Sequence, residues 1–280
     1  MARFKRSSRL KILAIALAVA LMLGLAVDIP ARVQAQSKPD SLTSKLPDQW
    51  EFRAPRAPGD KTPDYREGGV TRGPEDGNGD NCIEKDDLLV ALVPSSVGAT
   101  TAEYPTIYWY MPKTWASVAE FRLQDADDQV VYYTKYFLAK SAKGMVENTP
   151  RIMSLSLPAF SNISPLKIGQ EYQWSLWLTC GDPIDKSGRP YVEGKIKRVA
   201  ADPALVRRIS QATPQDRVAL YADARLWYET LSTLIELQRD RPNSREVAEA
   251  LDKLLTSVGL DKISQKLVNR AGLSASVTNP

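Results

Sequence analysis

Seven short apolar stretches follow one another between residues 88 and 199, with turn-forming residues between them. The first, residues 88–93, is continuously apolar and stops at Pro94. The other six are residues 107–111, 121–123, 130–137, 152–157, 172–178 and 191–199. Stretches of this length, rich in β-branched and aromatic residues, are typical of strands. This part of the chain therefore predicts an antiparallel β-sandwich.

One segment narrows the kind of sandwich. Residues 166–172 read Leu-Lys-Ile-Gly-Gln-Glu-Tyr, the spacing at which a tyrosine near the start of a strand hydrogen-bonds to the backbone upstream, as in a tyrosine corner. The segment resembles the corresponding stretch of fibronectin type III domains. It favours an immunoglobulin/fibronectin-III-like sandwich; the alternative is that Tyr172 is an ordinary core aromatic.

From residue 202 onward the apolar spacing becomes helical. Asp202 and Thr213 each precede a proline, which is a capping residue followed by proline at the first helical position. Two apolar stripes follow, separated by the segment Pro-Asn-Ser at residues 242–244: Leu220, Ala224, Trp227, Leu231, Leu234 and Leu237, then Val247, Leu251, Leu254, Leu255 and Val258. We expect a C-terminal, TPR-like helical hairpin packed on the sandwich, with a short helix near residues 263–267. Trp227 and Tyr228 are adjacent, so we expect only one to face the helical core and the other to bridge to the sandwich.

Residues 1–35 have the order of a secretory signal peptide. Basic residues precede an apolar run over residues 12–27, and Val-Gln-Ala at residues 33–35 fits a cleavage site. Because the run is shorter than the ~20 residues of a membrane-spanning helix, we expect cleavage; an uncleaved anchor is the alternative. The predicted organisation is a signal peptide over 1–35, a flexible linker over 36–81 with Trp50 and Phe52 as docking points, a β-sandwich over 82–200, the helical hairpin over 201–268 and a disordered tail over 269–280.

Removing the signal changes the charge of the protein. The whole chain has a net charge of +4. Its first 35 residues hold six basic residues and one acidic residue, a net +5, so about −1 remains after cleavage. The basic balance therefore belongs to the signal and gives no argument for nucleic-acid binding. The chain also has no histidine, which excludes His-based catalytic triads and His-ligated metals.

The chain has two cysteines, Cys82 and Cys180. In an oxidising compartment they form an evident disulfide pair. Closing a loop of that length stabilises a fold by about 4–5 kcal/mol in the chain-entropy model. The alternative is two buried free thiols.

Residues 76–87 resemble a calcium-binding loop. Oxygen-bearing side chains alternate along them, with Asp76, Asn78, Asp80 and Asp87 as candidate ligands. Asn81 replaces the usual glycine, and the Gly- and Pro-rich residues before the loop predict no entering helix. We therefore expect no cofactor, with calcium as the alternative.

Candidate sites for other chemistry are few. Without histidine, catalysis would require paired carboxylates, and the carboxylates near strand ends are Glu171, Asp182, Asp185 and Glu193. Nothing local pairs them, so we expect no catalytic residues. Aromatic residues are a better candidate for binding. Trp109 and Trp174 are expected in the core, and Tyr108, Tyr110 and Trp115 are candidates for an exposed binding surface.

The order of these landmarks resembles a family of exported cyanobacterial proteins known as a domain of unknown function, DUF928. The marks run from about Gly68 to Leu260: Gly68-Gly69-x-Thr71-Arg72-Gly73, Cys82, residues 89–94, Tyr108 to Pro112, residues 121–125, Leu157-Pro158, Pro165-Leu166, Gly169-x-x-Tyr172-x-Trp174, Cys180, residues 192–199, Thr213-Pro214, residues 220–222 and Trp227-Tyr228. The resemblance implies a cyanobacterial envelope or secreted protein, and it supplies no activity and no site residue.

These observations predict an exported, non-catalytic binding or scaffolding protein in the periplasm, at the cell surface or secreted. We expect an envelope protein as the partner, then a glycan, with no nucleic acid and no stable membrane span after cleavage. The alternatives are a carboxylate-dependent hydrolase acting on envelope polysaccharide and a calcium-stabilised interaction module.

Overall fold

The protein is described by a computed structural model. It describes residues 42, 46, 47, 50–52, 65–68, 82, 83, 87–138, 151–159, 163–179 and 189–270, without the side chains of 268–270. The chain divides into a unit over Met1–Asp40 and a unit over Ser41–Pro280. All described residues belong to the second unit.

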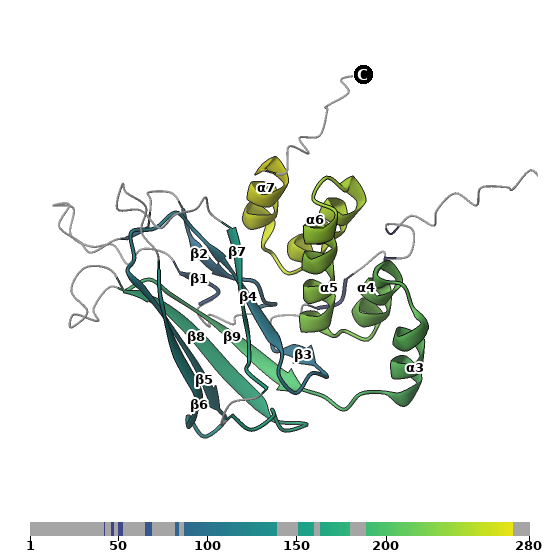
Figure 1. Cartoon of the computed structure of the whole chain (residues 1–280), viewed down its shortest axis with the longest axis horizontal. Coiled ribbons are helices and arrows are strands. Elements are labelled where there is room, and N and C mark those ends of the chain that lie inside the picture. The colour runs from purple at the N-terminus through teal and green to yellow at the C-terminus, as the bar shows by residue number, and fades with distance from the viewer. Residues whose placement is uncertain are drawn as a thin grey trace, which may run out of the picture. The chain divides into compact units, whose positions relative to one another are not determined.

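The described chain is mainly β and then α, as the sequence predicts (Figure 1). Its nine strands are β1 (Glu67–Gly68), β2 (Leu89–Ala91), β3 (Gly98–Thr100), β4 (Thr106–Met111), β5 (Val118–Asp125), β6 (Val130–Phe137), β7 (Arg151–Ser156), β8 (Glu171–Thr179) and β9 (Tyr191–Arg198). They form a four-stranded sheet in the order β1-β2-β4-β7 and a five-stranded sheet in the order β3-β9-β8-β5-β6. All seven predicted strands are present. The prediction of a purely antiparallel protein is wrong at one edge, because β3 runs parallel to β9.

Alternation along the strands makes the core. In β5, for example, Ala119, Phe121 and Leu123 are buried and the residues between them are partly exposed. The matching positions of β8 and β9 are buried in the same way, and Phe121 stacks on Trp174 with ring centroids 6.0 Å apart. One cluster of buried apolar residues draws on both sheets and on the helices, so the sheets and helices share a core.

The segment before β8 has the predicted hydrogen bond. The backbone N–H of Lys167 donates to Tyr172 Oη at 2.9 Å, which is the contact that defines a tyrosine corner. Gly169 between them has φ +83°, in the left-handed region that glycine enters without strain. Its backbone N–H donates to Arg198 O at 2.7 Å, which fixes this turn against β9.

Five helices follow the strands: α3 (Pro203–Gln211), α4 (Pro214–Asp223), α5 (Trp227–Asp240), α6 (Arg245–Ser257) and α7 (Asp261–Arg270). Asp202 and Thr213 cap α3 and α4 as predicted, and Ser244 caps α6. The predicted hairpin corresponds to α5 and α6, but the apolar stripe that begins at Leu220 is divided between two helices. The chain turns at Arg225, which has φ 57°, and this turn separates α4 from α5.

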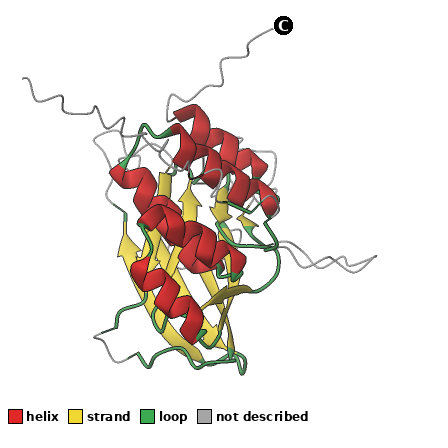
Figure 2. Ribbon diagram, turned by 90° about the vertical axis from the view of Figure 1, so that its right-hand side faces the viewer, coloured by secondary structure: helices red, strands yellow, loops and turns green. Residues whose placement is uncertain are grey.

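The helices lie across one face of the strands (Figure 2). Lys266 of α7 lies over the ring of Tyr110, 5.8 Å from its centroid, and Ser232 of α5 hydrogen-bonds to Tyr108. Both tyrosines lie on one face of β4, and Ile107 and Trp109 on its other face are buried as well, so β4 has buried side chains on both faces.

Both residues of the Trp227–Tyr228 pair are buried, so the expectation that only one faces inward is wrong. The reason is that the first turn of α5 packs against both sheets. Trp227 Nε1 donates to Leu92 O at 3.0 Å, just beyond β2, and Tyr228 Oη donates to Lys195 O of β9 at 3.2 Å. The pair therefore joins the first turn of α5 to both sheets.

Part of the predicted linker belongs to the folded unit. Leu42, Leu46 and Phe52 are buried, and the ring of Phe52 meets that of Trp227 edge-on with centroids 5.2 Å apart. Arg66 is also buried and donates to Val258 O, at the end of α6, at 2.8 Å. The predicted boundary at residue 82 therefore leaves out β1 and these buried side chains.

Candidate functional site

The predicted aromatic surface is only partly exposed. Tyr108 and Tyr110 are buried, which corrects their assignment to an exposed surface, because α5 and α7 cover the face of β4 on which they lie. Burial raises the pKa of Tyr108, an effect that the bond from Ser232 opposes. Trp115 is 41% exposed, and Trp109 and Trp174 are core residues as predicted.

Three of the four candidate calcium ligands, Asp76, Asn78 and Asp80, lie outside the described residues. The fourth, Asp87, already has cationic and N–H partners. Its carboxylate is 2.5 Å from Lys266 Nζ and accepts from the backbone N–H of Leu88 at 3.1 Å and of Lys113 at 3.2 Å. Among the described residues no group of three or more acidic, Cys or His side chains could hold a metal ion. The calcium loop stays a prediction, and a metal there would compete with Lys266 for Asp87.

The predicted disulfide also involves a position outside the described residues, Cys180. Cys82 is buried, and its carbonyl accepts from Trp115 N at 2.8 Å. Ser117, two residues further on, donates its backbone N–H to Thr179 O at 3.0 Å. The segment around residues 115–117 thus contacts both Cys82 and the residue before Cys180. The bridge stays a prediction, and this neighbourhood supports it.

A different set of aromatic residues lies on the outer face of the five-stranded sheet. Cross-strand partners share a face, and Glu120 pairs with Trp177, which in turn pairs with Tyr191. Their neighbours in sequence, among them Phe121 and Leu176, point the other way and are buried. The outer face is therefore the one that carries Trp177 and Tyr191.

The rings on this face contact one another in a row. Tyr65 stacks on Tyr191 with centroids 5.8 Å apart and planes 28° apart, and Tyr191 stacks on Trp177 at 6.2 Å and 22°. The guanidinium of Arg122 lies over the Trp177 ring, 5.1 Å from its centroid, within the range of a cation–π interaction. We call Tyr65, Tyr191, Trp177 and Arg122 the aromatic row.

A charged network adjoins the aromatic row. Glu120 accepts hydrogen bonds from Tyr133 Oη at 2.7 Å and Arg189 Nη2 at 2.8 Å, and Lys135 Nζ lies 3.6 Å away. Burial alone would raise the pKa of Glu120, but the hydrogen bonds from Tyr133 and Arg189 and the positive charges of Arg189 and Lys135 lower it to about 2. Glu120 is therefore ionised at any physiological pH, and it fixes the side chains around it.

The sequence did contain a signal for the aromatic row. Trp177 is three residues after Trp174, so in a strand the two must lie on opposite faces. Once Trp174 is assigned to the core, Trp177 is assigned to the outside. Tyr65 had no such signal, because it precedes a strand of two residues within the predicted linker.

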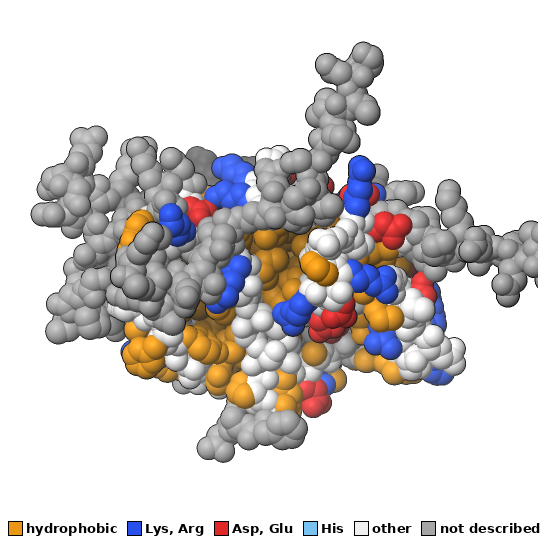
Figure 3. Space-filling view, turned by 45° about the horizontal axis from the view of Figure 1, so that its top comes forward, with side chains coloured by type: hydrophobic (Ala, Val, Ile, Leu, Met, Phe, Trp, Pro, Cys, Tyr) orange, Lys and Arg blue, Asp and Glu red, His pale blue; other side chains and the backbone are white. Residues whose placement is uncertain are grey.

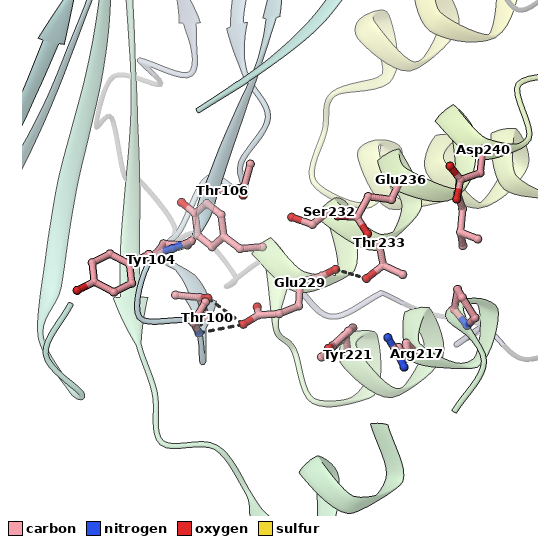
Figure 4. Close-up of a pocket in the computed structure, with 15 residues that line it drawn as sticks. Thr100, Tyr104, Thr106, Arg217, Tyr221, Glu229, Ser232, Thr233, Glu236 and Asp240 are labelled. Atoms are coloured by element: carbon pink, nitrogen blue, oxygen red, sulfur yellow. Dashed lines mark hydrogen bonds between the residues drawn. The ribbon is translucent and has the colours of Figure 1, made fainter. Parts of the chain in front are cut away.

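A pocket of about 380 Å³ is the second candidate site (Figure 4). It lies between the segment from Thr100 to Thr106 and the helices α4 and α5, and polar side chains line it: Arg217, Tyr221, Glu229, Ser232, Thr233, Glu236 and Asp240. Burial and the charge of Glu229 raise the pKa of Tyr221, and Arg217 opposes the shift. The pocket is thus polar, with more acidic than basic side chains.

Glu229 has a structural role in this pocket. Its Oε1 accepts from Thr100 Oγ1 at 2.8 Å and from the N–H and Oγ1 of Thr101 at 2.7 and 2.9 Å. Its Oε2 is buried and has no hydrogen-bond partner in the described part of the chain. Through the bonds to Oε1, Glu229 anchors the end of β3 and the residue after it to α5. Solvent does not reach Oε2, so Glu229 does not offer a free oxygen to a ligand.

The carboxylates considered for hydrolysis are not paired in the described structure. Glu171 forms an ion pair with Lys197 at 3.2 Å, and Glu193 accepts from Gln173 Nε2 at 3.0 Å. Asp182 and Asp185 lie outside the described residues. Burial raises the pKa of Glu193, but no second carboxylate is hydrogen-bonded to it in the part of the chain that is described.

The fold and its surfaces define a protein of two β-sheets and C-terminal helices with a partly exposed row of aromatic and arginine side chains. A family model, described as Domain of Unknown Function (DUF928), matches residues 67–268. The chain belongs to this family. No curated protein matches it. Within the described residues, no helix is both long enough and apolar enough to cross a membrane.

Proposed function

We propose that this protein is an exported, non-catalytic binding or scaffolding protein of the cell envelope, and that a partner protein docks on the aromatic row. The observation that carries the proposal is the row itself. Aromatic and arginine side chains are the residues that most often dominate the binding energy of protein interfaces. Here four of them lie in contact on one sheet face.

The row is ordered before any partner arrives. Each ring contacts a neighbouring ring, and Glu120 holds Tyr133 and Arg189 beside the row. Side chains that are already ordered lose less conformational entropy on binding. The face is therefore suited to binding without rearrangement.

The contacts within the row favour a protein over a glycan. A sugar ring stacks on the free face of an aromatic ring, but Arg122 covers a face of Trp177, and Tyr191 has Trp177 and Tyr65 as stacking partners. A protein partner can instead pack on the ring edges and bond to the guanidinium. A glycan is the alternative that the same test addresses.

The scaffold that we propose is an immunoglobulin-like sandwich. Consecutive strands are divided between the sheets, with β4 and β7 in one and β5, β6, β8 and β9 in the other. The tyrosine-corner bond of Tyr172 near the start of β8 is a further mark of that class. Export rests on the N-terminal signal pattern, and cleavage is tested by N-terminal sequencing of the secreted protein.

Photo-cross-linking in the producing cell tests the partner. A photoreactive phenylalanine analogue replaces Tyr65, at the exposed end of the row, and in a matched control it replaces Lys253, which is exposed on α6. We expect a discrete protein adduct from position 65 that is absent from position 253. The adduct should disappear when Arg122→Ala and Trp177→Ala are added.

Three results would contradict the proposal. Equal adducts from positions 65 and 253 would show that the row has no special affinity. An adduct digested by glycosidases but not by proteases would replace the protein partner by a glycan. Retention of the adduct in the Arg122→Ala/Trp177→Ala variant would place binding elsewhere.

A further inference from the structure

Strand β6 forms an edge of the five-stranded sheet. Among the described strands it pairs only with β5. It is eight residues long and contains neither proline nor glycine. Edge strands are usually shortened, bent, covered or charged, because their free backbone groups can pair with another chain.

The register shows which backbone groups of β6 point away from the sheet. Leu138 donates its backbone N–H to Ser117 O at 2.9 Å, so residues 138, 136, 134 and 132 face β5 with their N–H and C=O groups. The N–H and C=O groups of Tyr133, Lys135 and Phe137 therefore point outward from the edge. Nearer the β5–β6 turn the register shifts between Leu123 and Gln124, so Val131 has no partner in β5 and lies at a bulge.

The side chains of β6 are unusually apolar for an exposed strand. Phe137 is 85% exposed, Val130 54% and Tyr133 44%. Apolar side chains gather on the left of Figure 3, the side on which Figure 1 draws the strands of this sheet. Lys135 is the one charged residue of β6, and it is engaged with Glu120 and the Tyr133 ring of its own sheet. The usual protection of an edge by charge is thus weak here.

We propose that a second copy of this chain pairs with β6, antiparallel, about a two-fold axis at Thr134. A two-fold axis perpendicular to the sheet keeps the outer faces of both copies on the same side, so odd residues must pair with odd residues. With Thr134 opposite the partner's Thr134, Tyr133 pairs with the partner's Lys135 on one side of the axis, and Lys135 pairs with the partner's Tyr133 on the other. The outward-pointing backbone groups of Tyr133 and Lys135 then form hydrogen-bonded pairs.

The charges of this register are complementary. Tyr133 bonds to Glu120, which is ionised, and in the dimer the partner's Lys135 lies opposite Tyr133. The pairing therefore repeats between copies the Lys135–Tyr133 contact of 5.8 Å that exists within one copy. Tyr132 lies opposite the partner's Tyr136, an aromatic pair of the kind that stabilises sheets.

The consequence is one continuous ten-stranded sheet with two aromatic rows on the same side. An isologous contact of this kind closes at two copies. It uses the edge of the sheet and leaves Tyr65, Trp177 and Tyr191 free. The proposed dimer goes beyond the proposed binding of a partner to the aromatic row. The two proposals are independent, so a result against one does not contradict the other.

A disulfide-trapping experiment tests the axis. Directly opposite residues in a non-hydrogen-bonded pair have Cα atoms about 4.5 Å apart, within the range of a disulfide. We therefore expect the full-length mature Thr134→Cys variant to oxidise to a covalent dimer in high yield. The control Asp127→Cys, exposed at the β5–β6 turn, should give at least about ten-fold less under the same conditions.

Sedimentation equilibrium completes the test. At roughly 100 µM the unmodified protein should sediment as a dimer. Lys135→Pro removes an outward N–H and leaves the backbone groups that bond to β5 unchanged, so it should keep the far-UV spectrum of the fold and sediment as a monomer. The proposal would be overturned by a monomer at every concentration, by equal trapping of both cysteine variants, by a dimer that survives Lys135→Pro in a folded protein, or by open-ended assembly.

Discussion

Trp174 of β8 donates its indole N–H to Tyr228 Oη of α5 at 3.4 Å, and Tyr228 in turn donates to Lys195 O. Trp174 and Tyr228 are buried, so these bonds lie where water cannot replace them. Burial raises the pKa of Tyr228 far above its ordinary value, so the phenol stays a donor at every pH at which the protein folds. The pair is a buried polar link between the five-stranded sheet and the helices.

Tyr228→Phe should therefore destabilise the whole unit. The substitution keeps the ring but leaves the Trp174 N–H and Lys195 O unsatisfied in the core, which costs about 1–3 kcal/mol. The measurement is the free energy of unfolding from urea denaturation followed by tryptophan fluorescence. Tyr133→Phe, which removes a hydroxyl from an exposed ring, is the control and should cost less than about 1 kcal/mol. Equal losses of unfolding free energy in the two variants would show that the buried bonds of Tyr228 stabilise the protein no more than the exposed bond of Tyr133.

Gly194 should tolerate no side chain. It pairs with Trp174 across β8 and β9, and a Cβ built on it would lie 2.6 Å from the indole Nε1 and Cε2. Since Trp174 is packed in the core and cannot withdraw, Gly194→Ala should lower the free energy of unfolding by about 1–3 kcal/mol or more. The adjacent exposed Lys195→Ala is the control, expected within about 0.5 kcal/mol of the unmodified protein. A Gly194→Ala protein of unchanged stability would contradict the packing described.

Local patterns of the sequence predicted the strands well because each strand carries its own signal. The turn residues bounded β4 and β7, and alternation located the buried positions of β5 and β8. The parallel pairing of β3 with β9 could not be predicted, because β3 is the three-residue segment Gly-Ala-Thr and has no apolar alternation. The division of α4 from α5 was missed because Ala224 and Trp227 continue the apolar spacing across the turn at Arg225.

The candidate sites were harder to predict, since they depend on which faces other elements cover. Alternation places Tyr108 and Trp109 on opposite faces of β4, but it does not tell that helices cover one face and a second sheet the other. Glu229 had no local signal either, because its partners, Thr100 and Thr101, are remote in sequence. By contrast, the capping residues and the Tyr172 corner act within a few residues, and these predictions are confirmed.

The predicted Cys82–Cys180 bridge has a direct chemical test. In the exported protein, denatured without reductant, we expect no thiol that reacts with an alkylating agent, and two after reduction. Because the bridge would close a long loop, Cys82→Ser/Cys180→Ser should lower the free energy of unfolding by about 4–5 kcal/mol or somewhat less. Ser117→Ala is the control for local disturbance, because Ser117 lies in the segment that contacts both Cys82 and Thr179. Two reactive thiols in the unreduced protein would show the prediction to be wrong.

The charged network beside the aromatic row predicts an acid-dependent loss of stability. The pKa of Glu120 is lowered from 4.5 to about 2 by the groups that bind its carboxylate. A carboxyl with a lowered pKa in the folded state stabilises the fold above its unfolded pKa, and this contribution is lost as the pH falls from about 4.5 toward 2. The side chain is 16% exposed, so solvent screens part of the effect, and we expect a contribution on the order of 2 kcal/mol.

Urea midpoints measured between these pH values should fall more steeply with falling pH for the unmodified protein than for Glu120→Gln, which has no charge to lose. Glu171→Gln, which removes an exposed ion pair with Lys197, should keep the steep dependence; parallel curves for Glu120→Gln and the unmodified protein would mean that Glu120 does not stabilise this face.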